Sequence, residues 1–123
     1  MAIIYIVDDD AAFRKATSRL LRAAGYDVEV YESAEQLLAR LPVQSELGCI
    51  LLDVIMPGLS GPELQERLSE LGSTLPTVFL TAADEGPVQG AKYLLTKPVS
   101  KDTLLETIER ALRDDGLRDE RSE

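Results

Sequence analysis

Four short strand-like segments, each ending in or running into a polar or charged residue, constrain most strongly how this chain can fold. They are Ile3–Val7, Cys49–Leu52, Thr77–Thr81 and Tyr93–Thr96. The first two are apolar throughout, which predicts strands buried on both faces of a sheet. A fifth segment, Tyr26–Tyr31, places Val and acidic residues alternately, which predicts an edge strand.

Segments with helical spacing of apolar residues lie between these strands. They cover residues 11–24, 33–41 and 62–72, and a last one follows Ser100. Ser33 with Gln36 predicts a capping box, and Pro62 suits the first turn of a helix. Strands that alternate with helices along the whole chain predict an α/β fold, with a parallel sheet, right-handed crossovers and helices on both faces.

Composition excludes several classes of function. The 123 residues suit a single domain, and the formal net charge of −9 argues against direct nucleic-acid binding. The acidity either serves solubility alone or is partly concentrated at a cation site. There is no histidine, which excludes His-ligated zinc and histidine catalysis. We expect no signal peptide, no membrane span, a cytoplasmic location, and a buried, unreactive Cys49.

The residues at the strand ends form the candidate site. Ligands of an open parallel sheet bind beyond the carboxyl ends of its strands, so these residues are expected to converge on one crevice. They are Asp8, Asp9, Asp53, Thr81 and Lys97. Converging carboxylates repel one another, and a hard cation together with an ammonium group relieves the repulsion. Mg²⁺ suits such a carboxylate set, and a lysine can bind phosphate as a point charge. The pattern therefore predicts a carboxylate placed to attack phosphorus.

Each residue also has a simpler interpretation. Asp10 is expected to cap the first helix, and Asp8 and Asp9 alone could belong to the same acidic first turn. Asp53 alone could be a surface turn acid, and Lys97 a solvated loop lysine. The combination, rather than any single residue, carries the prediction. Consecutive acids without a central glycine do not fit a calcium-binding EF-hand loop, and the chain has no P-loop motif.

The motifs jointly resemble the receiver domain of two-component response regulators, of the FixJ-like type. The resemblance covers about residues 2–113 and is carried by five segments. These are Ile6–Asp10, Leu51–Gly61, Phe79–Ala82, Gly90–Ala91 and Leu95–Pro98. It implies a flavodoxin-like, doubly wound sheet of five strands in the order 2-1-3-4-5. It also implies a receiver domain over residues 1–115, and we expect residues 116–123 to form a charged, disordered tail.

The resemblance implies a metal site and a phosphoacceptor. Asp53 would accept the phosphoryl group and contribute to binding Mg²⁺. Asp9 would bind the cation directly, and Asp8 largely through water. The backbone carbonyl of Ile55 would be a further ligand.

The remaining roles concern the phosphoryl group and its source. Thr81 would hydrogen-bond a phosphoryl oxygen and Lys97 would pair with it, and the bond between Lys97 and Pro98 is expected to be cis. The donor would be a phosphohistidine on a sensor histidine kinase or a phosphotransfer protein. The downstream partner and the oligomeric state, a homodimer included, stay open.

Two departures from the family pattern stand out. The family has a full helix between the threonine and the Gly-Ala pair, whereas residues 82–89 are few and contain Gly86-Pro87, so we expect the fourth helix to be lost or reduced to a turn. The usual aromatic residue three positions before the lysine is Leu94 here. Tyr93 should point to the opposite face and should not replace it. Ile55 and Ala83 lack groups that position water, so we expect slow self-dephosphorylation.

Three functions compete. The first is a phosphorylation switch without a separate enzymatic activity. The second is a degenerate receiver that binds partners without phosphorylation, favoured by the shortened helix and opposed by the complete acidic set. The third is an unrelated Mg²⁺-dependent phosphohydrolase with Asp53 as nucleophile.

Overall fold

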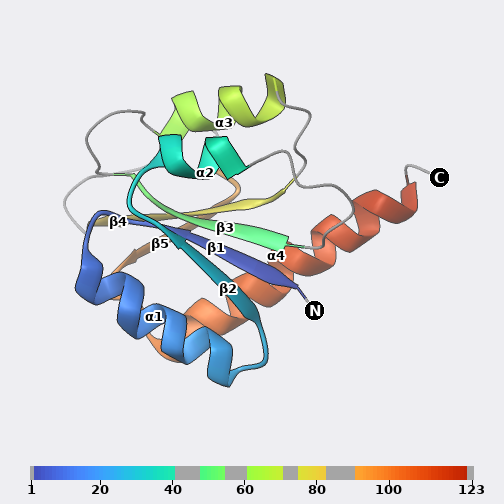
Figure 1. Cartoon of the computed structure of the whole chain (residues 1–123). Helices are drawn as coiled ribbons and strands as arrows, with labels where there is room; N and C mark the ends of the chain where they lie inside the picture. The colour runs from blue at the N-terminus through green and yellow to red at the C-terminus, as the bar shows by residue number, and fades with distance from the viewer. Residues whose placement is uncertain (1, 41–47, 55–60, 71–74, 83–90, 122–123) are drawn as a thin grey trace.

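The computed structural model describes residues 2–40, 48–54, 61–70, 75–82 and 91–121. Five parallel strands form one sheet in the order β2-β1-β3-β4-β5 (Figure 1). The strands are β1 (Ile3–Val7), β2 (Asp27–Tyr31), β3 (Gly48–Asp53), β4 (Thr77–Ala82) and β5 (Tyr93–Lys97). The predicted α/β class and strand order are confirmed, and the strand bounds agree to within about one residue.

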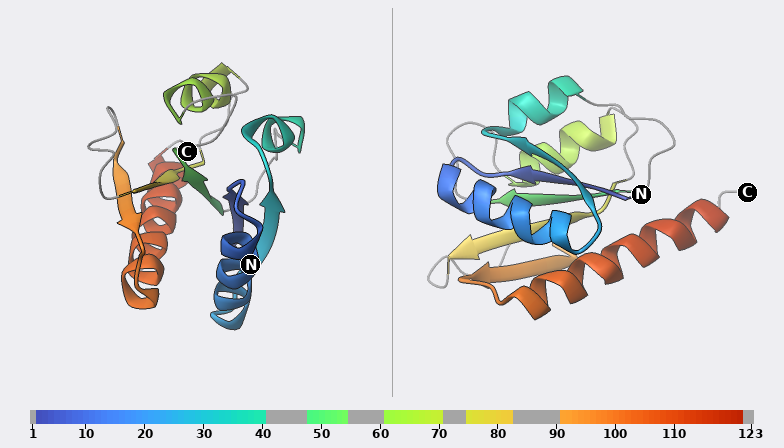
Figure 2. Two further views of the ribbon diagram at one scale, coloured as in Figure 1. Left: turned by 90° about the vertical axis from the view of Figure 1, so that its left-hand side faces the viewer. Right: turned by 60° about the horizontal axis from the view of Figure 1, so that its bottom comes forward.

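The described helices cover the two faces of the sheet in pairs. They are α1 (Ala11–Ala23), α2 (Ala34–Arg40), α3 (Gly61–Glu70) and α4 (Lys101–Arg121). Helices α2 and α3 lie on one face, and α1 and α4 lie on the other (Figures 1 and 2). This is the doubly wound arrangement in which the carboxyl ends of the central strands stay open to a ligand.

The buried residues of β1 explain why the helices lie on both faces. Ile4 and Ile6 join the core beneath α1 and α4, whereas Tyr5 and Val7 join the core beneath α2 and α3, and all four are fully buried. The same alternation continues in β3 and β4, where buried residues on the two faces include Cys49, Leu51, Val78 and Leu80 against Ile50, Leu52 and Phe79. Each valine, leucine, isoleucine or phenylalanine side chain among them contributes about 1.5–3 kcal/mol on burial. Cys49 is fully buried, as expected.

The helix ends follow the capping signals with one variation. Asp10 caps α1, because its side chain accepts hydrogen bonds from the amides of Ala12 and Phe13 at 3.0 and 3.3 Å. The Ser33 hydroxyl accepts from the Gln36 amide at 3.2 Å. The Gln36 side chain accepts from the Glu32 amide at 2.9 Å, rather than from the Ser33 amide of a standard capping box.

The edge strand is less covered than its alternation predicted. Val28 packs against the core beneath α1 and α4, but Val30 is 44% exposed. Among the described strands β2 pairs with β1 alone, so the outer residues of β2 keep contact with solvent.

Two sequence predictions concern regions beyond this core. The shortened fourth helix falls on residues 83–90, which lie outside the described residues. Residues 116–123 are expected to form a disordered tail, but α4 continues through this segment as far as Arg121. Gly116 is the one residue of this segment that commonly ends a helix, but no proline follows Ser100, and leucine, arginine and glutamate favour helix, so α4 continues past the glycine. The domain limit at residue 115 stays a prediction. Within the described ranges, no helix is long and apolar enough to cross a membrane.

Gly48 begins β3 where the backbone of β1 comes very close. A Cβ atom at this position would lie 2.8 Å from the carbonyl oxygen of Ile3 and 3.3 Å from the Tyr5 ring. We expect Gly48→Ala to lower the free energy of unfolding by about 1–3 kcal/mol, as overpacking does. Urea unfolding measures it, with Lys15→Ala on the exposed side of α1 as the control. Wild-type stability of the Gly48 variant would contradict this close approach.

The start of β5 is tied to α4 by a tyrosine and an aspartate. The hydroxyl of Tyr93, which is 6% exposed, donates to the carboxylate of Asp114, and Lys92 forms an ion pair with the same carboxylate at 3.2 Å. Burial, followed by the hydrogen bond and the negative charge of Asp114, raises the pKa of Tyr93 to about 12. The raised pKa makes this part of the folding stability depend on pH.

The direction of this pH dependence follows from the pKa of Tyr93 in the unfolded and the folded chain. Its pKa is near 10 in the unfolded chain and about 12 in the fold, so the hydroxyl stabilises the fold fully below pH 10 and loses its contribution as the pH rises towards 12. We expect Tyr93→Phe to be less stable than the wild type at pH 7, and this difference to close between pH 10 and 12. Urea unfolding across pH measures it. In an Asp114→Asn background the same substitution should have a smaller effect at pH 7, because the charged acceptor is gone, and its remaining dependence on pH comes mainly from burial of the Tyr93 ring. A difference in the Asp114 background that persists at pH 12 would contradict the assignment.

Candidate functional site

Three carboxylates meet at the carboxyl ends of β1 and β3. Asp8 and Asp9 directly follow β1, and Asp53 ends β3, its neighbour in the sheet, in which Val7 pairs with Leu52. One oxygen from each carboxylate lies within 4.8 Å of the others. Asp8 is fully buried, Asp53 is mostly covered, and Asp9 is exposed. The predicted convergence of these three acids is therefore found, with an open side at Asp9.

Lys97 brings a positive charge to the acids from β5, which is two strands away from β3 in the sheet. It ends β5, and its Nζ lies 2.7 Å from Asp8 Oδ2 and 3.4 Å from Asp53 Oδ2. The second oxygen of Asp8 accepts a hydrogen bond from the Asp10 amide at 2.9 Å. One ammonium group thus joins two carboxylates that would otherwise repel each other.

The first turn of α1 also contributes to the position of Lys97. The Lys97 ammonium lies 4.1 Å from the centroid of the Phe13 ring, a distance at which the face of the ring attracts a cation. Burial by itself lowers the pKa of Lys97, but the hydrogen bond and attraction of Asp8, joined by those of Asp53, outweigh it and raise the pKa above its usual value. Lys97 therefore stays charged near neutral pH.

Thr81 lies between the acids and β5, the strand that carries Lys97. It is near the end of β4, where it pairs with Thr96, the residue before Lys97, while Asp53 pairs with Leu80. The Thr81 side chain is almost fully buried, and its hydroxyl donates a long hydrogen bond of 3.4 Å to the carbonyl of Ala82. Ile55, the predicted carbonyl ligand, lies outside the described residues.

The charges of the cluster indicate what it can hold. The cluster brings together three carboxylates and one ammonium group, so acidic groups outnumber the basic one. Carboxylate oxygens at this spacing are the ligands of hard divalent cations, and the exposed Asp9 gives such an ion a way in. The acidic pocket is therefore compatible with a divalent cation.

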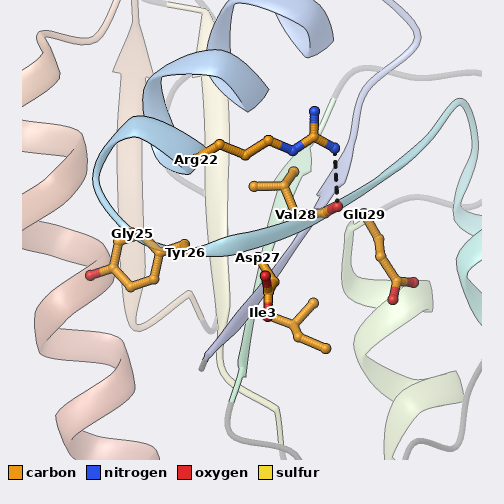
Figure 3. Close-up of a pocket in the computed structure, with 7 residues that line it drawn as sticks. All are labelled: Ile3, Arg22, Gly25, Tyr26, Asp27, Val28 and Glu29. Atoms are coloured by element: carbon orange, nitrogen blue, oxygen red, sulfur yellow. Dashed lines mark hydrogen bonds between the residues drawn. The ribbon is translucent and has the colours of Figure 1, made fainter.

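Two hollows among the described residues are not lined by the three acids. One, of about 590 Å³, is lined by residues at the amino ends of β1 and β2 and the end of α1, where Arg22 donates to the Val28 carbonyl at 3.4 Å (Figure 3). The other, of about 500 Å³, is a mainly apolar groove that includes Phe13, Lys97 and Pro98. Neither includes Asp8, Asp9 or Asp53 in its lining.

Tyr93 and Leu94 point to opposite faces of β5, as predicted. Tyr93 is buried in the core beneath α1 and α4, whereas Leu94 is 37% exposed. Tyr93 therefore does not take the place of an aromatic residue at position 94. The bond between Lys97 and Pro98 is cis, which confirms that prediction.

Sequence reasoning missed two residues near the acids. Phe13 and Arg14 belong to the predicted helix 11–24, and neither is among the predicted site residues. Arg14 Nη1 donates to the backbone carbonyl of Asp8 at 2.6 Å. Both follow the capping residue Asp10 within one helical turn, and that proximity in sequence was the available signal.

The chain is similar in sequence to known proteins. The sequence profile described as the response regulator receiver domain matches residues 4–109. The response regulator protein TodT of Pseudomonas putida is 38% identical over 118 residues, which cover 91% of this chain and 52% of TodT. The transcriptional regulatory protein FixJ of Bradyrhizobium diazoefficiens is 39% identical over 116 residues, which cover 89% of this chain and 56% of FixJ. The chain thus spans about half the length of these curated relatives.

Solved structures agree with the sequence relatives. The response regulator StyR superimposes with a TM-score of 0.89 at 35% identity, covering 98% of this chain and 64% of that one. The crystal structure of FixJ-N gives a TM-score of 0.80 at 32% identity, covering 92% and 94% of the two chains. With the fold, the acidic pocket and these matches in agreement, the chain belongs to the family of response regulator receiver domains of two-component signalling systems.

Proposed function

We propose that Asp53 accepts a phosphoryl group in the presence of Mg²⁺ and that this charge change switches the partner interactions of the domain. The observation that carries the proposal is the meeting of Asp8, Asp9 and Asp53 within 4.8 Å, with the Lys97 ammonium 3.4 Å from Asp53. Receiver domains are signalling modules, which fits a phosphoacceptor better than a phosphohydrolase.

The donor set fits the cation that the proposal needs. Mg²⁺ is commonly held by one or two carboxylates and keeps several waters, so Asp9 and Asp53 would bind it directly and Asp8 largely through water. The Ile55 carbonyl would complete the protein ligands. When bound, the ion supplies positive charge that neutralises oxygens on the transferring group.

The transfer itself needs one bond to form and one to break. A carboxylate oxygen of Asp53 attacks phosphorus, the P–N bond to the donor imidazole breaks, and its electron pair stays on the departing ring nitrogen. Lys97 moves its charge from Asp8 towards a phosphoryl oxygen, and the Thr81 hydroxyl donates to another. Because Lys97 is already beside Asp53, little rearrangement is needed before transfer.

The partners follow from the same chemistry. A phosphohistidine on a sensor histidine kinase or a phosphotransfer protein is the donor. The downstream partner is an output domain or a separate protein, and the chain works in the cytoplasm, where such kinases present their phosphohistidine. The resemblance implies that Ile55 and Ala83 flank the phosphoacceptor. Neither side chain can position a water molecule, so we expect slow self-dephosphorylation.

Phosphorylation of the purified chain tests the proposal. With MgCl₂ and phosphoramidate, a small donor with a P–N bond, intact mass should show one added phosphoryl group, and none with EDTA. Asp53→Asn should stay unlabelled. Asp10→Asn should be labelled, because Asp10 caps α1 and is not among the three acids of the cluster. A wild type that resists labelling while an ordinary receiver is labelled, or a labelled Asp53→Asn variant, would reject the proposal.

A variant of Lys97 distinguishes Mg²⁺ binding from phosphoryl transfer. Its ammonium competes with a cation for Asp8 Oδ2, so we expect Lys97→Met to bind Mg²⁺ more tightly. The same variant should transfer the phosphoryl group about 100-fold more slowly, because a charge that stabilises the transition state is lost. NMR titration with MgCl₂ and labelling kinetics measure the two effects. Lys101→Met, at the exposed start of α4, serves as the control, and weaker Mg²⁺ binding with unchanged transfer in the Lys97 variant would contradict the assigned role.

A further inference from the structure

Arg14 is an arginine that the proposed chemistry does not use, although it reaches the acidic pocket. It belongs to the first turns of α1, and its side chain is 15% exposed. Its Nη1 donates to the backbone carbonyl of Asp8 at 2.6 Å. A mostly covered guanidinium that binds a carbonyl next to a metal-site carboxylate acts on the backbone that carries the ligand.

Asp8 is held on every side by hydrogen bonds. Its amide donates to the Tyr31 carbonyl at 3.2 Å, and its Oδ1 accepts from the Asp10 amide at 2.9 Å. Its Oδ2 accepts from Lys97, and its carbonyl accepts from Arg14. Because Asp8 has no exposed surface, water cannot replace a lost partner without movement of the turn.

Arg14 also connects two of the segments that follow strands. Its Nη2 lies 3.7 Å from the carboxylate of Glu32, the residue after β2, and the Glu32 amide is in turn held by Gln36. Glu32 is exposed, so this ion pair orients the guanidinium more than it stabilises the fold. The planar fork of an arginine can reach both acceptors at once, which a lysine ammonium cannot do as well.

We propose that Arg14 is a positioning residue for the cation site. By fixing the carbonyl of Asp8, it sets the direction in which the Asp8 and Asp9 carboxylates leave the end of β1. The inference rests on the proposed function, because the ion concerned is the Mg²⁺ proposed above. Groups that orient metal ligands without touching the metal commonly contribute 10–100-fold to metal affinity.

If Arg14 acted only through its charge, its removal would change the Mg²⁺ affinity in the opposite direction. The direction of the change therefore tests the proposal. Removing a positive charge beside an acidic pocket should strengthen the binding of a cation. Loss of positioning should weaken it. Arg14→Met keeps much of the side-chain length and removes both the charge and the donors, so the direction of its effect separates the two explanations.

The experiment is an NMR titration with MgCl₂ of the full chain and its variants. We expect Arg14→Met to weaken Mg²⁺ binding by about 10-fold or more. The charge-matched control Lys15→Met, the exposed neighbour on α1, should stay within about twofold of the wild type or bind slightly more tightly. Mg²⁺ affinity in Arg14→Met that equals or exceeds that of the wild type would overturn the proposal.

Arg14→Lys covers the case in which Arg14→Met does not fold. It keeps the charge, so electrostatics predicts no change, whereas positioning predicts weaker Mg²⁺ binding, because one ammonium replaces the two-pronged contact. Wild-type affinity in this variant would overturn the proposal.

A second measurement needs no metal. The Asp10 amide, which donates to Asp8 Oδ1, should exchange faster with solvent in the Arg14 variants than in the wild type. The Tyr26 amide, bonded to the Leu21 carbonyl at the other end of α1, should exchange at an unchanged rate. A wild type that binds no Mg²⁺ would defeat the proposed function, whereas unchanged exchange at Asp10 would defeat the role of Arg14.

Discussion

The repulsion between carboxylates at the carboxyl ends of β1 and β3 is the constraint on which the arrangement of this domain depends. Asp8 and Asp53 are covered by the fold, and like charges so close together oppose folding unless a positive charge joins them. Lys97 provides that charge from a strand that is two places away from β3 in the sheet. The strand order, the helices on both faces and the acidic pocket are therefore parts of one solution, in which packing holds together groups that electrostatics alone would separate.

The fold was largely predictable because its signals are local. The apolar run Ile3–Val7 can be buried on both faces only if helices cover both faces, and the structure shows this alternation for Ile4 and Tyr5. The convergence of Asp8, Asp9 and Asp53 followed from one general property of parallel sheets, that strand ends meet at one edge. The capping role of Asp10 needed no more than its place before an apolar helix.

The remaining features depend on packing between segments that are distant in sequence. Nothing in the spacing of Phe13 or Arg14 shows that one contacts the Lys97 ammonium and the other the Asp8 carbonyl. The exposure of Val30 follows from how far the neighbouring elements cover an edge strand, which alternation alone does not encode. Helix α4 extends beyond the end that the sequence predicts. Charged residues reduce the burial of a segment, but they do not prevent it from forming a helix.

The central claim is that these acids share a single divalent ion beside Lys97, and a crystal structure grown with MnCl₂ tests it most directly. Mn²⁺ has the oxygen preference of Mg²⁺ and can be located by its anomalous scattering. The account predicts one anomalous peak in the pocket, about 2.0–2.3 Å from oxygens of Asp9 and Asp53, with the Lys97 ammonium close by. A pocket without a peak at saturating Mn²⁺, or an ion bound by acids elsewhere on the surface, would contradict it.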